Sequence, residues 1–483
     1  MIDMKLTRQY FDVKDVRFED TCSFAEGILT VSEKELQALT ADLFKAVGGF
    51  HLEITHPGEN ARIIHVLDTI APMVKVAGEG IQYSGFFSTP YTVGRGVTNM
   101  LSGFSVMESA ALPWDESNAS SGLLYPRDAI IELSGYYADY TPFSKTHNLV
   151  IVYDLNEGKS SMEYDNDIRL IAIRIATHLA ELTRGMEPDR QEVFSTQEEN
   201  PDLPGVVMVW QCQNQGPYAN TMLYGMPIDD MVPTVLHPNE MLDGCVVSGN
   251  YVWPAFKVPT YLHVNHPVLL ELYRRHGKDL NFKGVLFCRS HNPSNWHKQR
   301  CASFNVKLAQ MLGAKGLVMV WEGGGNACVD GMLTIQTAEK HGIKASTITF
   351  EFGGADGTEG ILLVDDVPEA DAICSGSSIE KPVQLAAVDR AIGGDTFRLN
   401  KESGGFFPPA REAWTPAQRV SSWAATSTGT RTSPRSAPPS PPSCMTTHPL
   451  TMPWPCSSKE AGVCLYRLKQ LRSPAPRPVR SWS

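Results

Sequence analysis

Residues 316–351, GLVMVWEGGGNACVDGMLTIQTAEKHGIKASTITFE, contain the pattern that decides the fold class. Residues 317–321 form a short apolar run, which is typical of a buried strand, and a Gly-rich turn follows them. Residues 329–340 have the pattern of a helix, and residues 345–351 have that of a second strand. A strand, a helix and a strand in succession predict a unit with two parallel strands.

The same alternation extends on both sides of this unit. Residues 284–288 predict a strand, and residues 298–312 predict a helix with Phe304, Leu308 and Met311 on one side. Residues 206–210, VVMVW, are similar to residues 317–321, LVMVW, which indicates either two similar α/β halves or two buried strands of similar composition. We expect an α/β fold: an α+β N-terminal half, then an open, mostly parallel sheet in the C-terminal half.

The N-terminal half reads mostly as strands and turns. Residues 33–47 predict a helix, because Ser32 and Glu35 have the spacing of a capping box. Residues 60–70 predict a strand and residues 166–184 an amphipathic helix. The turn at residues 94–98, GRGVT, has the composition of an anion cradle and equally that of an ordinary structural turn.

Polar turns follow three of the predicted parallel strands, at residues 289–292, 322–326 and 351–357. Ligands of open α/β sheets bind at the carboxyl ends of the strands. These turns therefore predict either one shared site or ordinary connections that need Gly and Asn. On the first hypothesis, Glu351 is a candidate acid or base, and Asn326 and Asp356 are candidates for substrate binding.

Residues 236–266, LHPNEMLDGCVVSGNYVWPAFKVPTYLHVNH, form a turn-rich segment between the halves. The predicted organisation is a mixed α+β domain at residues 1–235, this segment as a linker, an α/β domain at 267–408, and a tail at 409–483. His263 and His266 are candidate metal ligands or acid–base groups, or they have a structural role at a helix entry. Asn265 between them is a candidate for substrate binding.

Composition excludes several classes of protein. The chain has 483 residues and a net charge of -11, which suggests two to three domains. Residues 409–483 hold 10 Lys and Arg against 2 Asp and Glu, which leaves 32 against 51 for residues 1–408. Because residues 1–408 are this acidic, they are not expected to bind nucleic acid. The absence of an apolar run of about 18 residues predicts no membrane span, and the N-terminal residues lack the pattern of a signal peptide.

The ten cysteines are scattered, without a C-x-x-C pair. This spacing predicts neither a metal site nor a disulfide framework, and it favours free thiols in a reducing cytoplasm. The tail is rich in Pro, Ser, Thr and Arg, which argues against a packed core. It also has four tryptophans and three cysteines, so a reading-frame error near residues 405–410 is one hypothesis and a genuine basic tail the other.

Long blocks of the chain resemble one family. They include HPGENARIIHVLDTIAPMVKV (56–76), LPGVVMVWQCQNQG (203–216), LHPNEMLDGCVVSGN (236–250) and GIKASTITFEFGGADG (342–357). With these blocks the chain resembles the component B proproteins, α and β subunits, of glycine, sarcosine and betaine reductase complexes. The resemblance implies reductive cleavage of the C–N bond of a small amino acid or an N-methylated derivative. It also implies an oligomeric complex with a selenocysteine-containing subunit.

The family pattern implies cleavage of an Asn–Cys bond after the block that ends at Asn250, and conversion of that Cys into a pyruvoyl group. Here the next residue is Tyr251, which has neither a thiol nor an aliphatic hydroxyl. Asn250, Tyr251, Cys245 and His263 are therefore the catalytic candidates of this segment, and a pyruvoyl group is not expected. Two alternatives remain: an uncleaved paralogue that binds a ligand or a partner, or an enzyme with acid–base chemistry on the same scaffold.

Overall fold

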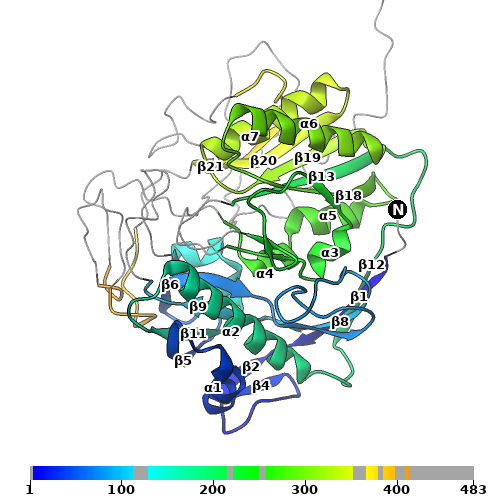
Figure 1. Cartoon of the computed structure of the whole chain (residues 1–483). Helices are drawn as coiled ribbons and strands as arrows, with labels where there is room; N and C mark the ends of the chain where they lie inside the picture. Colours follow the sequence, from blue (N-terminus) through cyan, green and yellow to red (C-terminus); the bar gives the residue numbers. More distant parts are fainter. Residues whose placement is uncertain are drawn as a thin grey trace, which may run out of the picture.

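The computed structural model describes residues 4–112, 129–214, 221–249, 257–351, 366–378, 384–396 and 409–413. Figure 1 shows two parts, a lower one built mainly from N-terminal residues and an upper one built mainly from C-terminal residues. The short helices α3 (Pro238–Leu242) and α4 (Thr260–Val264) lie between them. The mixture of strands and helices confirms the predicted α/β fold class.

Two mixed sheets form the first part, with the orders β12-β1-β8-β7 and β10-β6-β9-β11-β5, and β22 pairs with β6. Their strands are β1 (Leu6–Asp12), β5 (Val47–Thr55), β6 (Ala61–Ile70), β7 (Met73–Ala77), β8 (Gly96–Ser102), β9 (Phe104–Ser109), β10 (Ala129–Glu132), β11 (His147–Leu155), β12 (Arg190–Phe194) and β22 (Arg390–Ile392). The strand predicted at residues 60–70 is thus confirmed as β6, which is buried along its whole length.

Helix α2 (Ser161–Glu181) packs against strands of both sheets. Ser160 and Glu163 form a capping box at its start. The predicted apolar face is confirmed, because the side chains spaced three and four residues apart are buried, namely Ile168, Ile171, Ile175 and Leu179. The helix ends three residues before the predicted position 184.

A small sheet with the order β2-β4-β3 lies at the edge of the first part; its strands are β2 (Asp15–Phe18), β3 (Ser23–Ala25) and β4 (Ile28–Val31). Helix α1 (Glu33–Thr40) follows it and is shorter than predicted, because β5 already begins at Val47. Ser32 accepts a hydrogen bond from Glu35 N at 3.3 Å, as predicted. The Glu35 carboxylate does not return to Ser32. Its Oε2 accepts from Cys22 N at 2.8 Å, so the second half of the predicted capping box is wrong.

The second part is built on a sheet with the order β16-β18-β13-β19-β20-β21, parallel except for β16. Its strands are β13 (Gly205–Cys212), β16 (Thr234–Leu236), β18 (Asn281–Arg289), β19 (Gly316–Trp321), β20 (Lys344–Glu351) and β21 (Ile373–Ser378). The predicted strand–helix–strand unit is confirmed. The two similar runs, VVMVW and LVMVW, are neighbouring parallel strands of this one sheet, which fits the second of the two interpretations.

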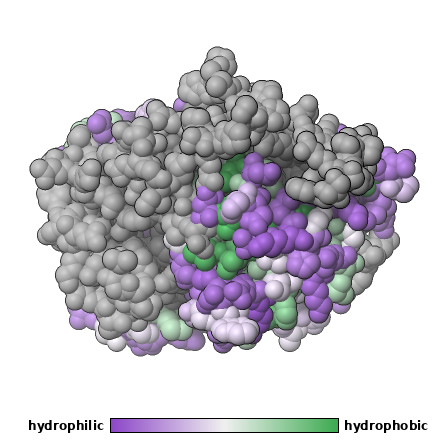
Figure 2. Space-filling model, turned by 90° about the horizontal axis from the view of Figure 1, so that it is seen from above, coloured by the Kyte–Doolittle hydropathy of each residue, from purple (hydrophilic) through white to green (hydrophobic). Residues whose placement is uncertain are grey.

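Helices α5 (Pro267–Arg275), α6 (Asn295–Met311) and α7 (Asn326–Lys340) belong to the second part. The apolar face predicted for α6 is wrong for Phe304 and Met311, whereas Leu308 packs against the core. Met311 is 73% exposed, and the buried side is formed by smaller residues such as Ala302, Val306 and Ala309. Figure 2 shows that the described surface seen from above is mostly hydrophilic, with apolar residues gathered beside the grey atoms.

The chain crosses between the two parts more than once. β13 precedes residue 235 but lies in the parallel sheet, and β22 follows that sheet in sequence but pairs with β6. The segment at 236–266 contains α3, β17 (Val246–Val247) and α4, and β17 pairs with β14 (Met222–Leu223), which also pairs with β15 (Met226–Pro227). The domain boundaries stay a prediction. Within the described ranges, no helix has the length and apolar character required to cross a membrane.

Candidate functional site

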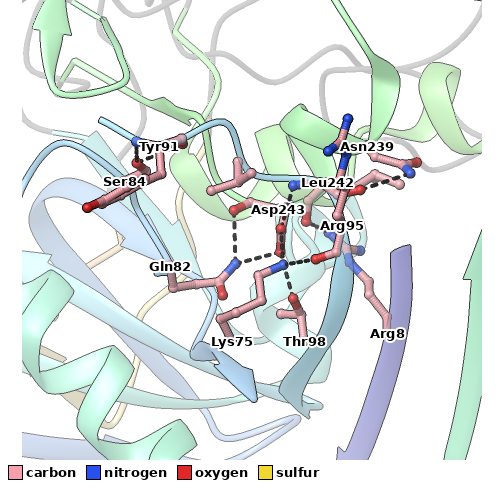
Figure 3. Close-up of polar contacts among 12 residues, drawn as sticks. Arg8, Lys75, Gln82, Ser84, Tyr91, Arg95, Thr98, Asn239, Leu242 and Asp243 are labelled. Atoms are coloured by element: carbon pink, nitrogen blue, oxygen red, sulfur yellow. Dashed lines mark hydrogen bonds and ion pairs between the residues drawn. The ribbon is translucent and has the colours of Figure 1, made fainter. Parts of the chain in front are cut away.

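Asp243 fixes residues 236–266, the central segment, to the first part of the molecule. Its carboxylate is fully buried and accepts hydrogen bonds from Gln82 Nε2 at 2.9 Å, Thr98 Oγ1 at 2.6 Å and Gly94 N at 2.7 Å. It also forms an ion pair with Lys75. Figure 3 shows these side chains converging on Asp243. The glycine-rich turn at Gly94 therefore does hold an anion, and that anion is a carboxylate of the chain itself.

Arg8, in β1, contacts the chain on both sides of residues 250–256 and holds it against the sheet β12-β1-β8-β7. Its buried guanidinium donates hydrogen bonds to Leu242 O at the end of α3 and to Val264 O at the end of α4. It also donates to Asn265 Oδ1 at 3.3 Å. One cation thus satisfies carbonyl groups that a helix end leaves without partners, and it positions both helices on β1.

A buried carboxylate holds the chain before residue 250. Ser248 N donates to Thr260 Oγ1 at 2.9 Å, and Thr260 in turn donates to both oxygens of Asp68, which lies in β6. Burial raises the pKa of Asp68 to about 7, although the hydrogen bonds from Thr260 oppose this shift. The upstream flank is therefore anchored on the sheet of the first part.

A second buried carboxylate holds the chain after residue 256. Glu322, the residue after β19, accepts hydrogen bonds from Val258 N and from Gln213 N, both at 2.7 Å. One bond goes to each oxygen of the carboxylate. Burial raises the pKa of Glu322 to about 7. The downstream flank is therefore anchored at the carboxyl edge of the parallel sheet.

Further buried charges surround these two anchors. Lys257 is almost fully buried, and burial lowers its pKa to about 8, against the opposing effect of Glu322. Arg169 donates to Asp165 at 2.9 Å, and burial raises the pKa of the neighbouring Glu108 well above its usual value. Each of these buried groups influences the protonation of its neighbours. A change of charge at one of them therefore affects the others.

His263 in α4 lies beside Glu322. Its Nδ1 accepts a hydrogen bond from Trp210 Nε1 at 3.2 Å, so the proton of the neutral imidazole is on Nε2. This Nε2 lies 3.8 Å from Glu322 Oε1, and burial lowers the pKa of His263 to about 3. Cys212 completes a group whose ligand atoms lie within 4.8 Å of one another. A metal ion does not suit this group, because neither histidine nitrogen has a free lone pair.

The carboxyl edge of the parallel sheet has buried polar atoms without hydrogen-bond partners in the described part of the chain. They are Gln213 Nε2 and Oε1, Ser290 Oγ, both ring nitrogens of His291, and His263 Nε2. The turns lie close together, since a Cβ atom on Gly323 would be 2.4 Å from His291 Nε2. Buried polar groups normally have partners. Together with Glu322 and Lys257, these groups form the candidate site for a small polar ligand.

Residues 4–419 match the family model of glycine/sarcosine/betaine reductase component B subunits. The chain belongs to this family. The match passes the expected start of the tail at residue 409, and the described residues there pack on the first part, where Arg62 donates to the buried Ala410 O.

Several curated relatives of component B type are similar over most of their length. The glycine reductase complex component B subunits alpha and beta of Acetoanaerobium sticklandii are 34% identical over 79% of this chain and 87% of their own. The sarcosine reductase complex component B subunit alpha of Peptoclostridium acidaminophilum is 35% identical, over 81% and 89%. The betaine reductase complex component B subunit alpha of the same organism is 33% identical, over 81% and 88%. No solved structure matches the chain significantly.

The predicted site residues of this component B chain lie in different environments. His263 lies in the candidate site, whereas Asn265 donates to Tyr261 O at 2.9 Å and joins α4 to Arg8. Asn326 is exposed at the start of α7. Cys245 is buried, and its backbone pairs with Glu240 O and Tyr224 N, which is a structural environment. Glu351 ends β20, and its side chain lies outside the description, as do Asn250, Tyr251 and Asp356.

The sequence alone assigned Glu322 and His291 to polar turns without giving either residue a role. It did not identify Asp68, Lys257 and Gln213 as site residues. A signal for Asp68 existed, because a carboxylate inside the largely apolar strand 61–70 has to be held by hydrogen bonds once it is buried. For Lys257 and Gln213 no local signal existed. Their role depends on Glu322, which is more than sixty residues further along the chain.

Proposed function

We propose that this chain is the substrate-binding component B subunit of a glycine/sarcosine/betaine reductase-type complex. The ligand would be a small amino acid or an N-methylated derivative, whose C–N bond the complex cleaves reductively. The observation that supports this role most directly is the double hydrogen bond of Glu322. The resemblance implies that the central segment is processed in this family. The Val258–Glu322 bond holds that segment at the carboxyl edge of the parallel sheet, where the polar atoms without described partners lie.

The residues of this chain do not fit a pyruvoyl group. Tyr251 stands where the family pattern implies cysteine, and its side chain cannot perform the acyl shift. Cys245 is no substitute, because burial raises the pKa of its thiol well above the usual value and so keeps it protonated. We therefore propose that substrate recognition uses ionic and hydrogen-bonding side chains alone.

The charges of the site suit a zwitterionic ligand. The Lys257 ammonium and the His263 Nε2–H are donors for a carboxylate, and Glu322 and Gln213 Oε1 are acceptors for an ammonium group. With an acid and an amine whose pKa values lie near neutrality, the site can also hold or release a proton close to physiological pH. The partner would be a selenocysteine-containing subunit of the same complex, and the compartment would be the cytoplasm, which agrees with the thiols of Cys212, Cys245 and Cys288.

The covalent state is tested by the mass of the intact chain under denaturing conditions, with and without a hydrazine that traps carbonyl groups. We expect one chain of 53.1 kDa that hydrazine does not modify. Two fragments divided near residues 245–251, with hydrazine on the C-terminal one, would show that a carbonyl group forms after all, and would overturn non-covalent recognition.

Ligand binding is tested by calorimetric titration of the full chain with glycine, sarcosine and betaine. At least one should bind, and His291→Ala should weaken its binding by about tenfold or more, because a buried donor is lost. The matched control is His341→Ala, which removes an exposed imidazole at the end of α7. If none of the three binds, or if both variants bind equally well, the ligand does not occupy this edge of the sheet.

A further inference from the structure

Cys22, Glu35 and His178 come together in the first part of the molecule, away from the carboxyl edge of the parallel sheet. Cys22 precedes β3, Glu35 lies in the first turn of α1, and His178 lies near the end of α2. One ligand atom from each lies within 4.8 Å of the others. The scattered cysteines, without a C-x-x-C pair, predicted no metal site, and this group is assembled from residues that are 13 and 143 positions apart.

The side chains are already oriented by their surroundings. Glu35 Oε1 lies 3.1 Å from His178 Nε2, while its Oε2 accepts from Cys22 N at 2.8 Å. Cys22 Sγ accepts from Ser32 N at 3.3 Å. Hydrogen bonds from backbone N–H groups to a sulfur and to a carboxylate are the contacts that orient the ligands of protein metal sites.

The geometry and the donor atoms suit zinc. Two N or O ligands at about 2.0–2.1 Å from Zn²⁺ in a tetrahedron lie roughly 3.3 Å apart, close to the distance between Glu35 Oε1 and His178 Nε2. A thiolate, an imidazole and a carboxylate form a donor set that zinc accepts. The side chains of His178 and Glu35 are 29% and 37% exposed, so an ion can enter from solvent and a water molecule can take the fourth position.

We propose that Cys22, Glu35 and His178 form a zinc site that fastens α1 and the small sheet to helix α2. On binding, Cys22 Sγ loses its proton to solvent and the Glu35–His178 contact is replaced by two bonds to the metal. The role is structural, because the ion would join three segments that are far apart in the sequence. This site is independent of the proposed reductase function.

The test is a zinc titration of the full, reduced, metal-stripped chain in competition with a chromophoric chelator, and a parallel cobalt titration followed by thiolate–cobalt absorption. The variants are Cys22→Ser and His178→Gln. The controls are Cys374→Ser, which removes the other half-buried cysteine among the described residues, and His341→Ala, which removes an exposed histidine. Cysteines 444, 456 and 464 are the same in all these proteins, so any zinc they bind appears as a constant background.

We expect the wild-type chain and both controls to bind one zinc equivalent more tightly than either site variant, by about 100-fold or more. Loss of a residue that hydrogen-bonds to a metal ligand typically lowers metal affinity by roughly 10- to 100-fold, and loss of a ligand itself should lower it further. Zinc should also raise the melting temperature of the wild type and leave that of the site variants unchanged. Equal zinc affinity in wild type, Cys22→Ser and His178→Gln would overturn the proposal. If Cys22→Ser does not fold, His178→Gln alone decides.

Discussion

The described residues include two groups of one cysteine, one histidine and one glutamate, and the two groups differ in what surrounds them. Cys212, His263 and Glu322 are fully buried. Cys22, Glu35 and His178 are half-buried beside solvent. In the buried group, backbone N–H groups occupy both carboxylate oxygens and the Trp210 indole occupies the histidine lone pair. In the half-buried group, one carboxylate oxygen faces the histidine.

The difference shows that residue types alone do not decide what such a group does. Hydrogen bonds from the surrounding chain decide which lone pairs remain free. In the buried group, two backbone N–H groups and the Trp210 indole fasten the chain and keep the proton of His263 on Nε2. In the half-buried group, His178 Nε2 and Glu35 Oε1 meet near solvent, and a metal ion can take the place of the proton between them.

The largest predicted effect is the difference in stability loss between Glu322→Gln in the buried group and Glu35→Gln in the half-buried group. Glu322→Gln should lower the free energy of unfolding by about 3 kcal/mol, because a glutamine amide NH₂ would face a buried backbone N–H at Val258 or Gln213. Glu35→Gln should lower it by less than about 1 kcal/mol, because the amide oxygen can still accept from Cys22 N near solvent. Denaturant unfolding measures both. Equal losses would contradict the distinction between the groups.

The second effect concerns the tautomer of His263. Trp210→Phe removes the N–H group that occupies Nδ1, whereas Trp321→Phe removes an equally buried indole whose Nε1 has no partner among the described residues. Trp210→Phe should therefore be less stable than Trp321→Phe by about 1–2 kcal/mol. This pair controls for the change in side-chain volume. Thermal unfolding of the two variants would contradict the assigned tautomer if their stabilities were the same.

Sequence reasoning could reach the parallel sheet and the position of its turns, because each strand and helix there is specified by local periodicity. It could not reach the two cysteine-containing groups. Glu322 meets Val258 across 64 residues, and Glu35 meets His178 across 143, so no local pattern contains either contact. The face of α6 was predicted wrongly for a related reason. Small residues such as Ala302 and Ala309 fill the tight contact with the sheet, and the larger Met311 is left outside.

The third effect is a pH dependence that arises from Glu322 and from two buried groups near it, Asp68 and Lys257. Burial raises the pKa of Asp68 and Glu322 to about 7, so the folded chain binds more protons than the unfolded chain between about pH 4.5 and 7. Stability from these groups is full at low pH and falls as the pH rises towards 7, by at most about 1.4 kcal/mol per pH unit for each carboxyl.

Lys257 acts in the opposite direction. Burial lowers its pKa from 10.5 to about 8, so the unfolded chain binds more protons between these values and stability rises with pH there. The summed contribution of Asp68, Glu322 and Lys257 should be lowest between pH 7 and 8. Lys257→Met should abolish the rise above pH 8. A rise that survives this substitution would assign it to other groups.

The smallest effect is expected at Cys22 in the absence of metal. Without zinc, Cys22→Ser should change the free energy of unfolding by less than about 0.5 kcal/mol, because the thiol is half-buried and a serine hydroxyl can also accept from Ser32 N. Cys212→Ser, in the buried group, should be clearly more destabilising, since it places a hydroxyl beside an apolar strand. Denaturant unfolding in a chelating buffer measures both variants. A large loss in Cys22→Ser under these conditions would mean that Cys22 stabilises the fold directly, and a metal ion would then not be needed to explain why this group is assembled.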